Sequence, residues 1–265
     1  MPTNFISVGG PRERDIAHSP SVHPLVCVVI PTYNERGNLE PLLRQIFGLG
    51  ISNLRVLVVD DHSPDGTGRL ADELAARQSE LHVLHRAGKG GLGTAYVDGF
   101  RWALLQHVSV VVQMDADFSH DPAVIPVLIS ALQQGADVAL GSRYVRGGSI
   151  VNWGFLRRSI SRFGNWYART VLGLRIRDLT GGFKAYRRQA LEAITHGHLS
   201  SVGYNFQIET TARAVWHGYR VTEVPITFTE RRHGKSKFNL AIMVEAFWKV
   251  WHLRSERPQS VEPGT

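Results

Sequence analysis

The sequence predicts an α/β protein built around a doubly wound, mostly parallel β-sheet. Apolar, β-branched segments alternate with segments of helical spacing through residues 25–140, and this alternation is typical of a parallel sheet with helices on both faces. Acidic or polar residues follow the ends of the predicted strands repeatedly. Because parallel strands end at one edge of a sheet, where open α/β sheets bind ligands, we expect the functional site along that edge.

Strands and helices alternate in the first half of the chain. Strands are predicted over residues 25–30, 54–59, 83–85, 108–114 and 136–140. Between them, apolar residues recur at helical spacing in residues 39–46, 70–75, 94–106 and 123–134. Gly48 and Gly50 end the first of these helices, since glycine commonly follows a helix C-terminus.

The second half of the chain is less regular. Residues 178–186 are interpreted as a turn that leads into a strand, residues 206–215 as a helix, and residues 219–228 as a last strand. A C-terminal helix is predicted over residues 238–253. The chain is therefore divided into a disordered arm (1–23), a main domain (24–229), a loop with the C-terminal helix (230–253) and a polar tail (254–265).

The composition is that of a globular protein with an anionic partner. Of the 265 residues, 43% are hydrophobic and 20% are charged, and the formal net charge is +7. This excess suggests a nucleic acid, a phosphorylated substrate or an acidic membrane. We expect no signal peptide and no transmembrane helix, because residues 1–23 lack an apolar core and no apolar run is long enough. The single cysteine, Cys27, suits a reducing compartment.

The clearest candidate site is the pair Asp115 and Asp117, which follows the strand predicted over residues 108–114. Residues i and i+2 of an extended chain point the same way, so both carboxylates should leave the sheet edge together. They would repel each other without a cation between them, and hard oxygen ligands suit Mg²⁺ or Mn²⁺. Such an ion usually also binds substrate phosphates. The alternative is a polar strand end with Asp121 as the N-cap of the next helix.

A glycine-rich segment offers a second interpretation. Gly88, Gly90 and Gly93 match the dinucleotide-binding pattern G-x-G-x-x-G. That pattern normally opens the first βα unit, whereas this segment lies in the third. It is not a P-loop either, since Lys89 precedes the later glycines instead of following them with Ser or Thr. A loop whose backbone approaches a ligand or the D-x-D strand is favoured.

A phosphoacceptor receiver domain is an alternative from another functional class. Asp60 and Asp61 follow one strand and Asp115 follows another, as in such domains. A receiver domain, however, needs only about half of this length, and its acidic pair normally follows the first strand. In this chain P-T-Y-N-E occupies that place. The receiver interpretation is therefore not favoured.

Several motifs follow one another along the chain, namely P-T-Y-N-E, V-D-D-H-S-P-D-G-T, K-G-G-L-G-T-A-Y, M-D-A-D-F-S-H-D-P, G-S-R-Y and D-L-T-G-G-F-K-A-Y. In this order they resemble glycosyltransferase family 2, and within it the polyprenol-phosphate (dolichol-phosphate) mannose synthases. The resemblance covers residues 31–237. It implies a GT-A fold with a Rossmann-like nucleotide-binding half, GDP-mannose as the donor, Mg²⁺ or Mn²⁺ as the cofactor, and a polyprenyl (dolichyl-type) monophosphate as the acceptor.

The resemblance also implies roles for individual residues. The implied donor-binding residues are Pro31, Tyr33, Glu35, Val59, Asp61, Asp115, Ala116, Asp117, Arg143, Arg231 and Lys237. The implied acceptor-phosphate residues are Arg143, Arg157 and Ser161, and the implied metal ligands are Asp115, Asp117 and Ser119. The expected catalytic residues are Asp117, Arg143 and Arg231. Ser119 departs from the family pattern, because some relatives carry Gln there as a further ligand.

The chemistry of a phosphate acceptor agrees with this composition. Attack on a sugar carbon by a hydroxyl normally needs a general base. A phosphate monoester, with a second pKa of about 6, is already a nucleophilic dianion at neutral pH. The enzyme then needs cations that hold two anionic reactants and a metal ion that neutralises the departing diphosphate. Many arginines without a dedicated base fit that requirement. The family displaces GDP with inversion.

A lipid acceptor requires contact with a membrane. The helix predicted over residues 238–253 is aromatic and mostly apolar, and Lys235, Lys237 and Arg254 flank it. Such an amphipathic helix can lie in the lipid interface or against a membrane-spanning partner subunit; the alternative is a core helix packed on the sheet. We expect a peripheral protein on the cytoplasmic face of the cell membrane that binds no nucleic acid. A glucosyl or aminosugar transferase and a catalytically inactive partner subunit stay open as alternatives.

Overall fold

The computed structural model describes residues 6–8, 24–196, 199, 204–230 and 240–257. Its main sheet contains β1 (Ile6–Val8), β2 (Val26–Thr32), β3 (Leu54–Asp60), β4 (Leu81–His85), β5 (Val110–Gln113), β6 (Val138–Ser142), β8 (Lys184–Arg187) and β9 (Val221–Pro225). A small parallel sheet is formed by β7 (Ser149–Val151) and β10 (Thr227–Thr229). The helices are α1 (Arg36–Phe47), α2 (Thr67–Ala75), α3 (Leu92–Leu105), the 3₁₀ turn η1 (Pro122–Val124), α4 (Ile125–Gln133), α5 (Phe155–Leu172), α6 (Arg188–Thr195), α7 (Tyr204–Trp216) and α8 (Leu240–Ser255).

The strand order of the main sheet is β1-β9-β6-β8-β5-β2-β3-β4. Only β1 and β8 run antiparallel to their neighbours in this described sheet, so the predicted doubly wound, mostly parallel sheet is confirmed. After β2, the chain adds β3 and β4 on one side and then returns to place β5 on the other side of β2. The winding direction therefore reverses between β2 and β5. In open α/β sheets, ligands bind at such a switch point.

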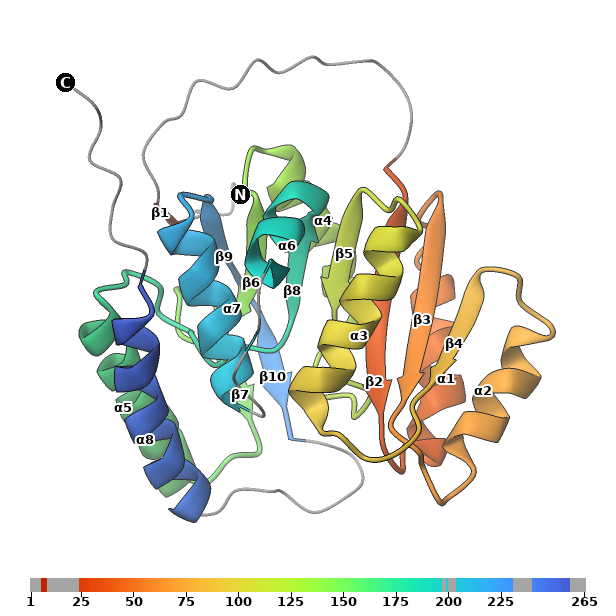
Figure 1. Cartoon of the computed structure of the whole chain (residues 1–265), viewed down its shortest axis with the longest axis horizontal. Helices are drawn as coiled ribbons and strands as arrows, with labels where there is room; N and C mark the ends of the chain where they lie inside the picture. The colour runs from red at the N-terminus through yellow and green to blue at the C-terminus, as the bar shows by residue number, and fades with distance from the viewer. Residues whose placement is uncertain (1–5, 9–23, 197–198, 200–203, 231–239, 258–265) are drawn as a thin grey trace.

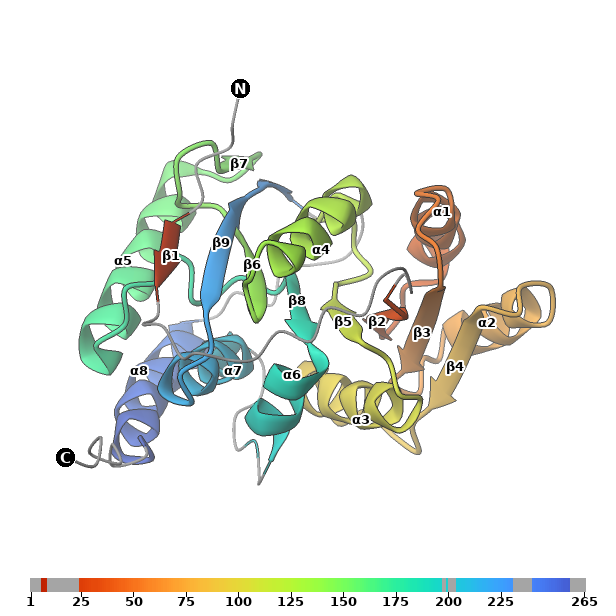
Figure 2. The same ribbon diagram turned by 90° about the horizontal axis from the view of Figure 1, so that it is seen from above.

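Alternating residues of β2 face two separate helix layers. Cys27 and Val29 belong to the core beneath α3, α6 and α7, whereas Val28 and Ile30 belong to the core beneath α1 and α4. Seen from above, these helices line opposite faces of the sheet (Figure 2). Helix α3 approaches β2 closely at Gly99, where an added Cβ would lie 2.4 Å from Cγ1 of Val29. A side chain at Gly99 would therefore force α3 off the sheet.

The strand predicted over residues 219–228 is divided between the two sheets. β9 pairs with β6 as far as Pro225, and β10 then pairs with β7. The change occurs at Ile226, whose amide donates to the carbonyl of Ser142 (3.0 Å) and whose carbonyl accepts from the amide of Ser149 (2.9 Å). The change of neighbouring strand cannot be seen in the apolar pattern, because both halves of the segment stay extended.

Several elements were not expected from the sequence, namely strands β1 and β7 and helices α5 and α6. Helix α6 follows β8 directly, and its N-cap residue, Arg187, makes no side-chain cap, so the usual start signal is missing. Strand β1 pairs antiparallel with β9, with Ser7 opposite Thr222, where the sequence analysis expected a disordered arm. A three-residue strand is too short to give a periodic pattern, so pairing across the chain decides its conformation.

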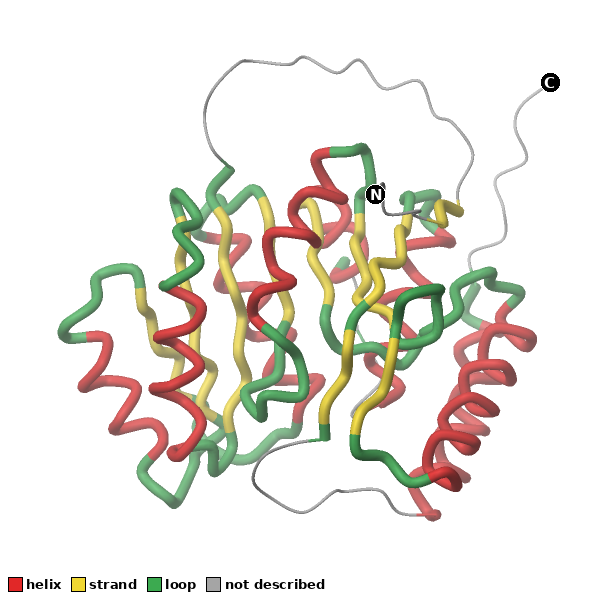
Figure 3. The backbone as a smooth tube through the Cα atoms, turned by 180° about the vertical axis from the view of Figure 1, so that it is seen from behind, coloured by secondary structure: helices red, strands yellow, loops and turns green. Residues whose placement is uncertain are grey.

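Helices α5 and α8 lie side by side at one end of the sheet, opposite the end that carries β4 and α2 (Figure 1 and Figure 3). The Tyr167 ring stacks on the Phe247 ring at a centroid distance of 4.1 Å. Val250 and Leu253 of α8 are buried, whereas Trp248 is 69% exposed. The C-terminal helix therefore packs on α5 and α7 with one face and leaves another uncovered. Its predicted start at Phe238 lies outside the described residues. Among the described residues, no helix is both long enough and apolar enough to span a membrane.

Candidate active site

A cavity of about 380 Å³ opens beside the ends of β2, β5 and β6; we call it the strand-end cavity. Of the expected site residues, it is lined by Pro31, Tyr33, Glu35, Asp61, Asp115, Ala116, Asp117, Ser119, Arg143 and Arg157. Residues from five separate segments of the chain thus meet at the switch point of the sheet. Side chains of opposite charge face the same space.

Other expected site residues lie elsewhere. Val59 is fully buried, 3.0 Å from the position of a Cβ on Gly99, so its side chain belongs to the core under α3. Ser161 lies on α5, and its hydroxyl accepts a hydrogen bond from the Tyr144 hydroxyl (2.7 Å). Neither Val59 nor Ser161 is among the described residues that line the cavity. Arg231 and Lys237 lie outside the described residues.

Tyr33 and Lys89 lie against each other in the lining of the strand-end cavity. The Lys89 ammonium lies 3.8 Å from the centroid of the Tyr33 ring, which is a cation–π contact. Glu35, the N-cap residue of α1, also lines the cavity and accepts a hydrogen bond from the side-chain amide of Asn38 (2.8 Å). An aromatic face, a cation and a carboxylate can together bind a nucleoside and its phosphate. Lys89 was not predicted from the sequence as a residue of this site.

The glycine-rich loop is fixed to the end of β3. The Asp61 carboxylate accepts hydrogen bonds from the amides of Gly90 and Gly91, each at 2.9 Å, and forms an ion pair with Arg86. Gly91, with φ of 94°, also lines the strand-end cavity. The loop backbone therefore approaches both Asp61 and the cavity. It opens α3 in the third βα unit, where a dinucleotide fingerprint is not expected.

Asp115 and Asp117 line the cavity just beyond β5. Asp115 accepts a hydrogen bond from the Tyr96 hydroxyl (2.7 Å), and Asp117 accepts one from the Ser119 amide (3.0 Å). Burial, together with the charge of Asp115, raises the pKa of Tyr96 well above its ordinary value, so the hydroxyl stays a donor. Asp121 caps η1 through the amide of Ala123 (2.9 Å), which confirms the N-cap expected for this residue.

The acidic pair fits a divalent ion that is shared with a substrate. The carboxylate and hydroxyl oxygens here are the ligands that Mg²⁺ and Mn²⁺ prefer. No group of three or more His, Cys, Asp or Glu side chains able to hold a metal occurs in the described part of the chain. An ion at Asp115 and Asp117 would therefore take further ligands from phosphate oxygens or water, which is how Mg²⁺ is usually bound.

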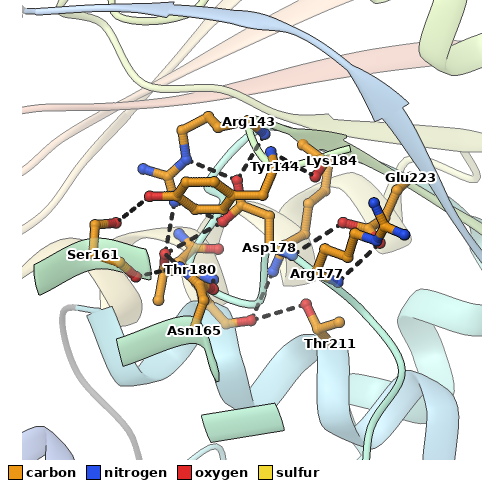
Figure 4. A network of polar contacts seen from close by, with 12 residues as sticks. Arg143, Tyr144, Ser161, Asn165, Arg177, Asp178, Thr180, Lys184, Thr211 and Glu223 are labelled. Carbon is orange, nitrogen blue, oxygen red and sulfur yellow. Dashed lines mark hydrogen bonds and ion pairs between the residues drawn. The ribbon is translucent and has the colours of Figure 1, made fainter. Parts of the chain in front are cut away.

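Arg143 is held by a buried carboxylate (Figure 4). Its guanidinium donates two hydrogen bonds to Asp178, at 2.7 and 2.6 Å, and a third to the Thr180 hydroxyl at 2.6 Å. The Arg143 amide also donates to Asp178 (2.9 Å). Asp178 is fully buried. This bidentate pair fixes the direction of Arg143 at the cavity wall.

Glu223 in turn holds the loop that carries Asp178. Its carboxylate accepts hydrogen bonds from the amides of Arg177 (2.9 Å) and Asp178 (3.0 Å), as Figure 4 shows. Burial raises the pKa of Glu223. Arg143 was predicted from the sequence, whereas Asp178 and Glu223 were not. The available signal was the aspartate that opens the D-L-T-G-G-F-K segment.

Aromatic residues surround Arg157, which also lines the strand-end cavity. The Arg157 guanidinium lies 4.0 Å from the Trp153 ring centroid and forms an ion pair with Glu230 (2.6 Å). The Trp153 ring packs edge-on against Phe228. His120 also lines the cavity, and burial lowers its pKa to about 4, so the ring stays neutral at neutral pH. These aromatic contributions were not predicted.

Lys184 is a buried cation behind the site. Its ammonium donates to the Gln207 carbonyl (2.8 Å) and to the Thr210 hydroxyl (2.9 Å). Burial lowers its pKa from 10.5 to about 7, although Asp178 opposes this shift. Between these two values the unfolded chain binds a proton that the folded protein lacks. This group therefore makes the free energy of unfolding rise with pH, by at most about 1.4 kcal/mol per pH unit.

We expect Lys184→Met to remove that dependence. Denaturant unfolding at pH 6, 7, 8 and 9 should show the wild type gaining stability relative to the variant from about pH 7 upwards, because the contribution is lost as pH falls through the folded pKa. Below about pH 6 the difference should be constant. Parallel curves across the whole range would mean that Lys184 keeps an ordinary pKa.

Comparison with characterised proteins identifies the family. Residues 27–195 match the family model described as Glycosyl transferase family 2. The chain is 49% identical over 255 residues to the polyprenol monophosphomannose synthase of Mycolicibacterium smegmatis, covering 94% of this chain and 96% of that protein. It is 48% identical over 225 residues to the undecaprenyl-phosphate mannosyltransferase of Micrococcus luteus, covering 85% and 92%.

Solved structures share the fold. A mannosyltransferase of Pyrobaculum calidifontis in complex with GDP-Man and Mn²⁺ gives a TM-score of 0.62 at 21% identity, covering 95% of this chain and 70% of that chain. A glucosyl-3-phosphoglycerate synthase of Mycobacterium tuberculosis in complex with Mn²⁺, UDP and glucosyl-3-phosphoglycerate gives 0.63 at 20% identity, covering 89% and 82%. The expected GT-A fold is confirmed, and neither the dinucleotide-binding nor the receiver interpretation is supported. With one family model matched over residues 27–195 and relatives aligned along most of the sequence, the chain belongs to glycosyl transferase family 2.

Proposed function

We propose that the protein transfers mannose from GDP-mannose to a polyprenyl (dolichyl-type) monophosphate, with inversion, to form polyprenyl-phosphate mannose. The observation that carries the proposal is a single cavity whose lining includes both the acidic pair Asp115 and Asp117 and the basic pair Arg143 and Arg157. The names of the two relatives support a mannosyl donor and a polyprenyl-type acceptor. The structure of the Pyrobaculum calidifontis enzyme with GDP-Man supports the nucleotide.

The acidic pair, Asp115 and Asp117, is assigned to the donor. Asp115 and Asp117, with Ser119, would hold Mg²⁺ or Mn²⁺ against the diphosphate. Such an ion supplies the positive charge that stabilises the departing nucleotide. Tyr33, Lys89 and Glu35, which line the same cavity, would bind the nucleoside. Arg231 and Lys237 stay proposed donor ligands on the strength of the family resemblance.

The basic pair, Arg143 and Arg157, is assigned to the acceptor. A phosphate monoester is mostly dianionic at neutral pH and can attack the sugar carbon without a general base. What it needs is a fixed position and a compensating charge. Arg157, oriented by Trp153 and Glu230, and Arg143, oriented by Asp178, provide both. Ser161, one helical turn from Arg157, stays the third proposed acceptor ligand.

Transfer assays test this function and its alternatives. The purified protein is incubated with polyprenyl phosphate, Mg²⁺ or Mn²⁺, and either labelled GDP-mannose or labelled UDP-glucose. We expect label in the organic phase from GDP-mannose and no label after chelation of the ion. Label in the organic phase from UDP-glucose but not from GDP-mannose would show that the donor is UDP-glucose instead of GDP-mannose. No transfer from either donor, with added membranes restoring none, would favour a catalytically inactive partner subunit.

We further propose that α5 and α8 rest on the cytoplasmic face of the cell membrane, directly or beside a membrane-spanning partner subunit. These helices expose an aromatic face, which we define as Phe163, Trp166, Phe247, Trp248 and Trp251, with exposed fractions between 43% and 69%. Tryptophan prefers the head-group level of a bilayer. The formal net charge of +7 would favour an anionic leaflet. Cys27 makes no disulfide, which agrees with a reducing compartment.

Replacing Trp248 and Trp251 with Ser should weaken binding to lipid vesicles by about tenfold or more, since each exposed ring would bury apolar area worth roughly 1 kcal/mol. Transfer to a long-chain acceptor in vesicles should fall together with vesicle binding. Transfer to a short, water-soluble polyprenyl phosphate should survive. Leu105→Ser is the matched control, because Leu105 is 75% exposed at the end of α3. Equal loss with both acceptors and a lower Tm would instead make the face part of the core.

A further inference from the structure

A second cavity, of about 480 Å³, shares Arg143 with the strand-end cavity but opens elsewhere. Besides Arg143, three arginines line it: Arg162 and Arg169 from α5 and Arg177 from the loop before Asp178. We call it the arginine pocket. None of the described residues in its lining is acidic, and none of these three arginines has an ion pair with a described residue. Arg143 and Arg157, by contrast, have Asp178 and Glu230 as partners.

The pocket and the strand-end cavity use different faces of α5. Arg162, Trp166 and Arg169 follow at i, i+4 and i+7, so they lie along one face of the helix. Arg157 precedes Arg162 by five residues, which corresponds to about 140° around the helix axis. One helix therefore presents a cation to each cavity. The acceptor phosphate held at Arg157 and a ligand of the arginine pocket would be separate groups.

The rim of the pocket is continuous with the aromatic face. Trp166 lines the pocket and is 51% exposed, and its ring lies 5.6 Å from that of Phe163, which is 57% exposed. Guanidinium groups bind phosphate oxygens in a fork geometry. An aromatic rim beside guanidinium groups that have no carboxylate partner among the described residues suits a phosphate that lies at the surface of a bilayer.

We propose that the arginine pocket binds the phosphodiester headgroup of an anionic phospholipid. The proposal rests on the proposed membrane contact of α5 and α8: insertion of the aromatic face brings lipid headgroups level with Trp166. The pocket then takes one headgroup through Arg162, Arg169 and Arg177, while Arg143 on its inner wall keeps its bond to Asp178. The bound lipid fixes the orientation of the enzyme on the surface and leaves the strand-end cavity free for the acceptor.

The test compares Arg162→Gln/Arg169→Gln with the control Arg44→Gln/Arg77→Gln, which removes the same charge from exposed positions on and near α1 and α2 at the other end of the sheet. Binding is measured to vesicles of phosphatidylcholine with and without phosphatidylglycerol. The pocket variant should lose about thirtyfold in affinity for the anionic vesicles, at roughly 1 kcal/mol per arginine. The control should lose less than about threefold, and binding to phosphatidylcholine alone should be unchanged. Inorganic phosphate at millimolar concentration should not displace the anionic vesicles.

Equal losses in both double variants would overturn the proposal in favour of unspecific charge attraction. Displacement by inorganic phosphate would overturn it in favour of a general anion site. Transfer to a short, water-soluble polyprenyl phosphate without vesicles should be unchanged in the pocket variant at an unchanged Tm. A selective loss there would assign the pocket to the acceptor instead. Vesicle binding is read without transfer, so failure of the proposed mannosyl transfer and failure of the pocket are distinguishable.

Discussion

Replacing Asp117 with Ala is expected to reduce mannosyl transfer by about 10³-fold or more while the protein stays folded. The carboxylate faces the strand-end cavity, and the loss of a group that holds charge-stabilising ions in a transition state typically costs about 3–4 kcal/mol or more. Its hydrogen bond from the Ser119 amide is confined to one turn, so we expect the fold to survive the substitution. Transfer rates and Tm are the two measurements.

Asp117→Asn and Ser119→Ala separate charge from shape in this experiment. The asparagine keeps the acceptor for the Ser119 amide but loses the charge, so it should be nearly as inactive as the alanine variant. Ser119→Ala removes the hydroxyl and leaves the amide, and a smaller loss is expected. Chelation of divalent ions should also abolish transfer by the wild type. Full activity in the presence of chelator, or wild-type turnover in Asp117→Ala, would contradict the assignment.

The largest loss of stability is expected for Asp178→Asn, at about 3–5 kcal/mol in the free energy of unfolding. The substitution leaves the Arg143 guanidinium at a buried wall without its carboxylate partner, and an uncompensated buried charge is costly. Transfer should also fall, because Arg143 loses its bidentate anchor. Denaturant titration gives the stability, and transfer is measured in conditions where the variant is still folded.

Glu230→Gln is the matched comparison, since it breaks the more exposed pair with Arg157. Exposed pairs contribute about 0–1 kcal/mol, so its stability should change little. Adding Arg143→Gln to Asp178→Asn should restore part of the lost stability by removing the unpaired charge, but it should restore no transfer. If Asp178→Asn costs no more stability than Glu230→Gln, the Arg143–Asp178 pair is not the anchor described above.

Local patterns were enough to predict the strands and helices that build the switch point. Residues 25–30 and 108–114 carry apolar patterns that any buried parallel strand requires, and acidic residues mark where the second of them ends. The antiparallel strand β8, inserted between β5 and β6, could not be placed in the same way. Its neighbours in the sheet are decided by packing over long sequence separations, which a local pattern does not contain.

The site was predictable where one segment carries the chemistry and unpredictable where two segments share it. The D-x-D pair is read from one strand end. Asp178, in contrast, bonds to Arg143 across 35 positions, and Glu223 holds Asp178 across 45. The positions of Val59 and Ser161 came from a resemblance, residue by residue, and both side chains lie outside the cavity lining. A motif fixes the residue type at a position without fixing where its side chain points.

The insertion of β8 also acts as a spacer between the two walls of the cavity. β5 and β6 are two strand intervals apart, or about 10 Å, so the strand end that carries Asp115 is kept that far from the one that carries Arg143. Gly181 and Gly182, which precede β8, line the interval without side chains to fill it. Doubling the separation of two anions halves their Coulomb repulsion. A donor diphosphate and an acceptor phosphate can thus be bound together, because the inserted strand β8 leaves room for the sugar between them.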